Sequence, residues 1–388
     1  MSRTLGRCSR ICNFANFAAD MRKNYLDGVR GWASVIVVLN HLVHNFLARA
    51  VPSLENKWLA FPTDGDLAVY VFFVISGFAL SIGYFEGAGL RILKSLALRR
   101  YIRLTVPVFA SSLIAFLILK SGAMHNLQLA ERDGNQPWLI QLYTLDPSAL
   151  GLLRFSLLDV YFNYSTATSY NPVLWTMSVE LFGSMLVFGL LALFGDLRNR
   201  SVIYAMAAAI LLYLNSPLLP FIAGIVLADL FTRSIPTGGR PSTVGGLALF
   251  VAGILGSVHG HTFQGSGYLT ALALCIVAGL TLCPPLRMLM ESKVSVALGK
   301  ISFPLYLTHV SVICSLSCSV FILATDRGIP VSVAALYTFA VSIPVIALVA
   351  VAFYPVESLS VSAARRFSTL LVVDSAVREE KKDHVPAG

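Results

Sequence analysis

Arg30 and His41 are the residues of this sequence whose types and spacing point most directly to chemistry. Arg30 directly precedes an apolar stretch at residues 31–48, and His41 interrupts that stretch. Eleven helical residues make about three turns, so both side chains share one helix face, with His41 about 16 Å deeper than Arg30. A bundle keeps an ionisable group at that depth mainly where it faces a polar interior or a pathway. The spacing therefore predicts a functional helix rather than a simple membrane anchor.

Two more ionisable side chains interrupt apolar stretches at a comparable depth. Glu180 lies about nine residues into the stretch 172–194, which places it roughly 13 Å deep. His309 lies a turn or two into the stretch 302–324. A lone histidine in an apolar helix usually only packs, but three such groups predict a proton-handling cluster. We expect His41 to act as a general base and Glu180 either to orient its imidazole or to support the cation that forms.

A basic turn and a pair of small residues complete the set of polar features. Arg99, Arg100 and Arg103 precede the apolar stretch 104–120 and have two interpretations. They either anchor the topology of the chain or bind an anionic ligand such as a nucleotide phosphate. Ser76 and Gly77 lie in the middle of another apolar stretch, where small residues allow helices to approach closely.

The composition places these residues in a membrane. The chain has 388 residues, of which 56% are hydrophobic and only 13% are charged, whereas soluble domains have about 25% charged residues. Windows of about 20 apolar residues predict an all-α, polytopic membrane helix bundle with about ten transmembrane helices. The predicted spans are 31–48, 67–85, 104–120, 172–194, 201–214, 217–232, 243–258, 268–284, 302–324 and 330–354.

The basic loops predict the orientation of this bundle. Arginine and lysine residues follow the even-numbered spans, as in the loop that carries Arg198 and Arg200 and the loop that carries Arg233 and Arg240. This pattern predicts a cytosolic N-terminus and a cytosolic C-terminus. The net charge of +9 is therefore interpreted as an orientation signal and not as a nucleic-acid-binding surface.

Three regions are expected along the chain. Residues 1–24 form a basic leader, interpreted as a cytosolic end, with a mitochondrial address as the alternative. Residues 25–357 form the membrane domain, and residues 358–388 form a cytosolic tail. Within the domain, residues 150–160 predict an interfacial or re-entrant helix. The cysteines have neither metal-ligand spacing nor the pattern of a disulfide scaffold, so we expect no metal site and no structural disulfides.

In their order along the chain, these segments resemble the acyltransferase-3 family of integral-membrane O-acyltransferases. The similarity extends from about residue 25 to 357, and residues 171–175 and 183–188 resemble the branch found in fungi. The similar segments are 27–31 with His41, 72–78, 99–104 with Pro107, 175–180, 304–309 and, more weakly, 354–357.

The resemblance implies that the protein transfers an acyl group, often acetyl, from acyl-CoA to a hydroxyl group. It implies that Arg30 and His41 form a functional pair and that Arg99, Arg100 and Arg103 help to hold the CoA. The acceptors that the resemblance implies are carbohydrates, lipids, peptides and hydroxylated secondary metabolites, among which the motifs do not choose; we expect a small hydroxylated metabolite or a carbohydrate. An endomembrane such as the endoplasmic reticulum is the expected location. Either His41 acts as a base in direct transfer, or it carries the acyl group covalently.

Two functions from other classes also account for buried polar residues. A proton-coupled transporter would use His41, Glu180 and His309 as a proton relay. The basic turn and the lack of a clear internal repeat are less typical of a transporter. An accessory membrane scaffold would use the same segments only for packing. CoA-dependent product formation separates the first function from the other two.

Overall fold

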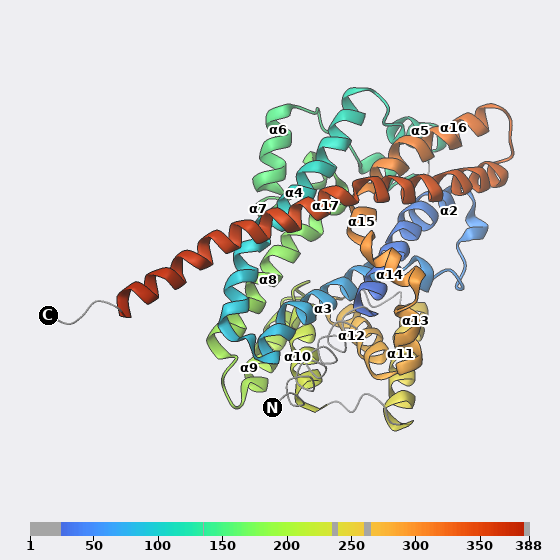
Figure 1. Ribbon diagram of the computed structural model, residues 1–388. Coiled ribbons are helices and arrows are strands. Elements are labelled where there is room, and N and C mark those ends of the chain that lie inside the picture. Colours follow the sequence, from blue (N-terminus) through green and yellow to red (C-terminus); the bar gives the residue numbers. More distant parts are fainter. Residues whose placement is uncertain (1–24, 135, 235–239, 260–264, 384–388) are drawn as a thin grey trace, which may run out of the picture.

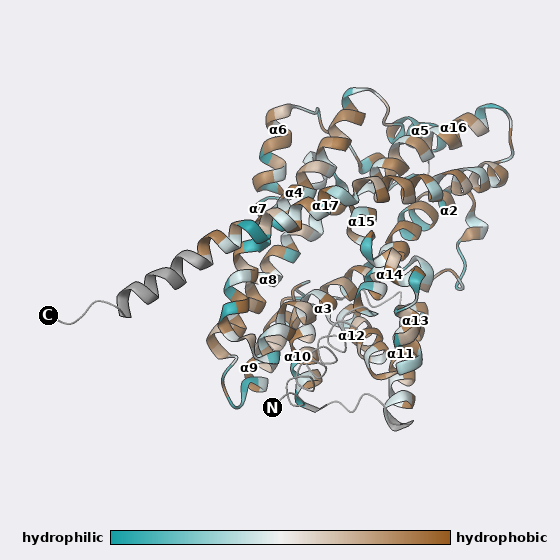
Figure 2. Cartoon of the chain, in the orientation of Figure 1, coloured by the Kyte–Doolittle hydropathy of each residue, from teal (hydrophilic) through white to brown (hydrophobic). Residues whose placement is uncertain are grey.

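The computed structural model describes residues 25–134, 136–234, 240–259 and 265–383, and every regular element in this part of the chain is a helix. The all-α class predicted from the apolar stretches is therefore confirmed. The helices pack into one bundle, across which the long helix α17 runs (Figure 1). Apolar residues cover most faces of these helices, and polar residues gather at their ends (Figure 2). The leader, residues 1–24, lies outside the described residues.

The first helical segments carry three of the predicted spans. The first helix, Tyr25–Ala50, contains a π-helical stretch, η1 (Asn40–Leu47), and ends in α2 (Ala48–Ala50). After two short turns, η2 (Pro52–Leu54) and η3 (Phe61–Thr63), the chain forms α3 (Gly65–Gly83), η4 (Tyr84–Ala88) and α4 (Gly89–Lys120). Gly87, with φ of +100°, interrupts the run between α3 and α4, in a conformation that glycine adopts readily.

The middle of the chain forms a peripheral helical segment and then three longer helices. The segment expected to be interfacial or re-entrant is helical, and its leucines at 150, 153, 157 and 158 are exposed. The elements are α5 (Asn126–Asp133), η5 (Leu139–Gln141), α6 (Ala149–Arg154), η6 (Phe155–Asp159), α7 (Val160–Phe162), η7 (Thr166–Thr168), η8 (Pro172–Leu174), α8 (Trp175–Phe194), α9 (Arg200–Tyr213) and α10 (Leu219–Ser234).

The last third ends in the longest helix. Its elements are α11 (Arg240–His259), α12 (Ser266–Leu282), α13 (Pro284–Met290), α14 (Lys293–Lys300), α15 (Ser302–Val312), η9 (Ile313–Ser317), α16 (Cys318–Asp326) and α17 (Val331–Asp383). The chain bends by 99° between α12 and α13. Helix α17 continues through residue 357 without a break, so no helix end marks the expected boundary between the membrane domain and the tail.

Each of the ten predicted spans falls on a helix, but not every helix is long enough to cross a membrane. Within the described residues, six helical stretches meet the length and apolarity of a span, or seven if α12 and α13 count as one bent span. One of the six stretches, Gly65–Lys120, contains both α3 and α4. Helix α9 has 14 residues and α10 has 16. The structure therefore confirms a polytopic helical membrane protein, while the count of ten and the orientation of the termini stay predictions.

Close helix packing positions the polar residues. A Cβ atom at Gly77 of α3 would collide with the backbone of Phe221 in α10, and one at Gly224 of α10 would collide with the backbone of α3. In the same way, Gly31 of the first helix meets the backbone of Gly299 in α14. Small residues let backbones approach in this manner, as expected for Gly77. These contacts hold the first helix and α3 inside the bundle.

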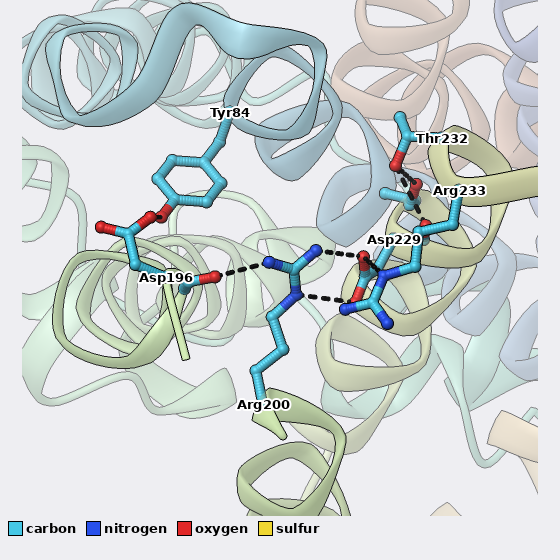
Figure 3. Close-up of polar contacts among 8 residues, drawn as sticks. Tyr84, Asp196, Arg200, Asp229, Thr232 and Arg233 are labelled. Carbon is cyan, nitrogen blue, oxygen red and sulfur yellow. Dashed lines mark hydrogen bonds and ion pairs between the residues drawn. The ribbon is translucent and has the colours of Figure 1, made fainter. Parts of the chain in front are cut away.

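A cluster of charged side chains ties three segments together at the ends of their helices. The carboxylate of Asp229 in α10 accepts hydrogen bonds from Arg200 at 2.6 and 3.0 Å and from Arg233 at 2.8 Å (Figure 3). Arg200 also donates to the carbonyl of Gly195, and Tyr84 donates to Asp196 at 2.6 Å. Arg200, identified as a topology marker, thus also holds α9 against α10, whereas the bond from Arg233 to Asp229 lies within α10.

We expect Asp229→Asn to destabilise the protein by about 1.5–3 kcal/mol, because the partly buried Arg200 would lose its charge-assisted hydrogen bonds to the carboxylate. Thermal unfolding of the purified protein in detergent measures this as a lower melting temperature. The control is Asp326→Asn, which removes a solvent-exposed pair with Arg132 and should lower the melting temperature clearly less, because exposed ion pairs contribute little to stability. Equal losses in the two variants would contradict a structural role for the Asp229 cluster.

Candidate active site

The two histidines identified in the sequence meet in the bundle interior. His41 belongs to the π-helical stretch η1, and His309 belongs to α15. Nδ1 of His41 lies 2.8 Å from Nε2 of His309, and the two rings are stacked with centroids 5.1 Å apart. The side chain of His309 is fully buried, whereas His41 is partly accessible. A π-helical turn is frequent at functional sites, and here it carries His41.

The hydrogen bonds of this pair determine which nitrogen carries each proton. Nδ1 of His309 lies 3.0 Å from the carbonyl oxygen of Leu305, which can only accept, so this nitrogen is the donor. In a neutral imidazole the other nitrogen, Nε2, then accepts a hydrogen bond, and His41 must donate to it from Nδ1. Nε2 of His41 is left with its lone pair. The arrangement can therefore present a base, oriented through a second residue.

Rigid contacts hold the histidine pair in place. The indole of Trp138 stacks on the His41 ring at 4.9 Å with an interplanar angle of 11°. The side-chain amide of Asn171 donates to the carbonyl of Leu307 in α15 at 2.7 Å. The hydroxyl of Tyr306 donates to the carbonyl of Val173 at 2.8 Å. These bonds attach α15 to the turn that precedes α8.

Glu180 occupies a different part of the interior from the one expected. Its carboxylate forms an ion pair with Arg100 of α4 and accepts a hydrogen bond from Ser76 of α3 at 2.8 Å. His41 instead has its Nδ1 bonded to His309. The expectation that Glu180 orients the His41 imidazole is therefore wrong: that partner is His309. Pairing with Arg100 satisfies the buried carboxylate at less cost than leaving both charges unpaired.

The structure separates the three arginines of the basic turn. Arg100 and Arg103 line a cavity of about 380 Å³, which we call the basic cavity. Arg99 does not line it, and its guanidinium bonds the hydroxyl of Ser95 on its own helix. Arg30 lines the basic cavity and lies 3.9 Å from the carboxylate of Asp27. Three of the four arginines identified in the sequence thus share one cavity.

The basic cavity is suited to a polar anionic ligand. Four cations line it against three carboxylates, and the cations are Arg30, Arg100, Arg103 and Lys300. Within the described residues, Arg103 and Lys300 form no hydrogen bond or ion pair. Nε of Arg100 and Oε2 of Glu357 are buried and also lack a partner there. Buried polar groups without partners are costly, so a bound ligand that reaches them gains free energy.

His41 lies in a second cavity of about 230 Å³, which we call the histidine cavity. Val69 and Tyr306 line both cavities, so these two side chains form the boundary between them. The first helix contributes to both cavities: Arg30 lines the basic cavity, and His41 lines the histidine cavity. Arg30 and His41 therefore lie on the same helix but line different cavities.

Some residues of the site carry no clear signal in the sequence. Trp138 follows a polar loop in a connection without a recognisable motif, so its stacking on His41 depends on tertiary packing alone. Tyr306 and Glu357 belong to segments that resemble family motifs, and that resemblance was the signal available for them. The described part of the chain has no group of three or more histidine, cysteine, aspartate or glutamate residues placed to hold a metal ion.

Comparison with known proteins agrees with the family suggested by the motifs. The family model described as an acyltransferase domain matches residues 23–354. An O-acetyltransferase, PaAT-1, from Phomopsis amygdali is 27% identical over 53% of this chain and 48% of its own length. The acyltransferase clz18 from Cochliobolus lunatus is 27% identical over 53% of this chain and 57% of its own length.

The chain thus spans about half the length of these curated relatives. No solved structure matches it. The family model covers most of the chain, including both histidines and every residue that lines the two cavities except Glu357. The chain therefore belongs to the acyltransferase-3 family and is an integral membrane protein.

Proposed function

We propose that this enzyme moves an acyl group, in the first place acetyl, from acyl-CoA to a hydroxyl group of a small metabolite or carbohydrate. The observation that carries the proposal is the hydrogen-bonded pair of His41 and His309 in a cavity that adjoins the basic cavity. The relative named as an O-acetyltransferase supports the choice of acetyl and of a hydroxyl acceptor. A transporter relay receives less support, because Glu180 is paired with Arg100 instead of the histidines.

In the proposed reaction, His41 is the general base. A hydroxyl group is a poor nucleophile until its proton is removed, and Nε2 of His41 takes this proton as the oxygen attacks the thioester carbon. The carbon–sulfur bond then breaks, and the imidazolium of His41 returns the proton to the leaving thiolate. The bond from His41 to His309 strengthens while His41 is charged, because charge-assisted hydrogen bonds are stronger than neutral ones. His309 is thus a positioning residue.

The basic cavity is the proposed donor site. CoA carries several phosphate charges, and guanidinium and ammonium groups are the usual partners of phosphate in proteins. Arg103 and Lys300 suit this role because no described carboxylate forms an ion pair with either cation. The thioester then extends between Val69 and Tyr306 into the histidine cavity, where His41 lies.

The first test of this function uses His41→Ala. Membranes that contain the wild type or the variant are supplied with radiolabelled acetyl-CoA and an extract of the native cell as acceptor. We expect the transfer rate of the variant to be at least about 100-fold lower than that of the wild type, since a general base contributes about that much or more. Its affinity for CoA and its melting temperature should stay close to those of the wild type.

His309 variants serve as the matched comparison in the same assay. His309→Gln keeps a side-chain oxygen that can accept the bond from His41 and should retain more activity than His309→Ala. Near-normal transfer by His41→Ala would refute its role both as a base and as an acyl carrier. If wild-type membranes produce no label with several acyl-CoAs, the proposed function itself is wrong, and solute flux would be measured instead.

We expect Arg103→Ala to weaken CoA binding by about 10-fold or more, the usual effect of losing a hydrogen bond to a charged group. Isothermal titration of the purified protein with CoA measures this change. Arg99→Ala is the control, because Arg99 lies on the same helix but contacts Ser95 outside the cavity. Equal affinities of the two variants would contradict the assignment of the basic cavity to the donor.

A further inference from the structure

A third cavity, of about 550 Å³, adjoins the histidine cavity on the side away from Arg30. We call it the outer cavity. Its size is within the range of small-molecule sites. Asn40, Gly65 and Asp66 line both the outer cavity and the histidine cavity, so the two are neighbours.

The three cavities follow one another along two helices. Along α3, Asp66 lines the outer and histidine cavities, Val69 lines the histidine and basic cavities, and Ser76 lines the basic cavity. The first helix repeats this order in the opposite direction, from Arg30 in the basic cavity to His44 in the outer cavity. His41 therefore lies between the basic cavity and the outer cavity.

The cations of the outer cavity already have partners. Arg49 forms an ion pair with Glu55 at 3.0 Å, and Lys57 lies over the ring of Trp58, with its ammonium 5.4 Å from the ring centroid. Trp58 is 81% exposed, so this pair belongs to the surface of the connection between α2 and α3. An anionic ligand would have to compete with these contacts.

The carboxylates of the outer cavity differ from one another in their partners. Asp64 caps α3 by accepting from the backbone N–H of Leu67 at 2.9 Å, and it also accepts from Ser257 at 2.6 Å. Asp66 forms no hydrogen bond or ion pair with the described residues. An ionised carboxylate only accepts hydrogen bonds, so Asp66 selects a ligand group that donates one.

The rest of the lining is partly apolar. Side chains of the connection after α2 and of the ends of α11 and α12 contribute it, namely Leu59, Val258, Leu269 and Leu272. A ligand that fills this cavity therefore needs an apolar skeleton as well as hydrogen-bond donors. Three carboxylates against two engaged cations also disfavour a negatively charged ligand.

We propose that the outer cavity binds the acyl acceptor, and that Asp66 accepts a hydrogen bond from a second hydroxyl or ammonium group of that acceptor. The hydroxyl group to be acylated then enters the histidine cavity and faces His41. The acceptor is a neutral or cationic amphipathic small molecule with at least two hydrogen-bond donors. This assignment rests on the proposed function and specifies the class of its second substrate.

The charge of the acceptor is tested directly. The native-cell extract is passed over an anion exchanger at neutral pH, and the unretained and retained fractions are each incubated with radiolabelled acetyl-CoA and wild-type membranes. We expect labelled product from the unretained fraction. Label formed only with the retained, anionic fraction would overturn the assignment while leaving the acyltransferase function intact. No label from either fraction or from the whole extract would refute the proposed function instead.

The role of Asp66 is tested with Asp66→Asn and with the extract fraction that supports transfer. We expect the half-saturating amount of this fraction to rise by about 10-fold, since a hydrogen bond to a charged group is lost. The affinity for CoA should not change. Asp146→Asn, at an exposed aspartate that lines none of the three cavities, should behave as the wild type.

Asp66 also lies in the first turn of α3, where a negative charge stabilises the helix by interacting with its dipole. The melting temperature of each variant therefore accompanies the kinetics. Asp66→Glu keeps the charge at the helix end and should retain more affinity for the fraction than Asp66→Asn. If Asp66→Asn has the melting temperature of the wild type and needs the same half-saturating amount of the fraction, Asp66 does not bind the acceptor.

Discussion

The hydrogen bond between His41 and His309 is the interaction on which the arrangement of this site depends. It joins the first helix to α15 inside a bundle of apolar helices, where a polar group without a partner is costly. Because His309 donates in turn to the carbonyl of Leu305, the chain of donors has a single direction. That direction leaves Nε2 of His41 unprotonated. One imidazole thus orients the other, and no carboxylate of the described residues is hydrogen-bonded to either ring.

Some charged side chains of the bundle form ion pairs with one another, and others are left to bind a ligand. Glu180 pairs with Arg100, and Asp229 pairs with both Arg200 and Arg233 within the bundle. Arg103 forms no ion pair within contact distance among the described residues and lines the basic cavity. Basic residues of similar appearance in the sequence therefore have different physical roles. The difference lies in which carboxylate the fold places beside each cation.

The order of the cavities gives the proposed chemistry a direction. The basic cavity lies on one side of the Val69 and Tyr306 boundary, and the histidine cavity lies on the other. A donor with an anionic end and an acceptor with hydroxyl groups can then approach His41 from opposite sides. Tyr306 is immobilised by its bond to Val173, so the boundary is part of the rigid bundle. Cations outnumber carboxylates in the lining of the basic cavity, and carboxylates outnumber the arginine and lysine side chains in the lining of the outer cavity.

The sequence by itself determined the helical membrane class, the positions of the helices and the residues His41, His309, Arg100 and Arg103. Such features depend on local properties, namely the length of apolar stretches and the rarity of ionisable groups within them. Only the tertiary structure decided that His309, and not Glu180, is the partner of His41, and that Trp138 stacks on it. Depth along a helix follows from residue number, but the direction in which neighbouring helices present their side chains does not. That direction depends on close contacts such as Gly31 against Gly299, which form only when the whole bundle packs.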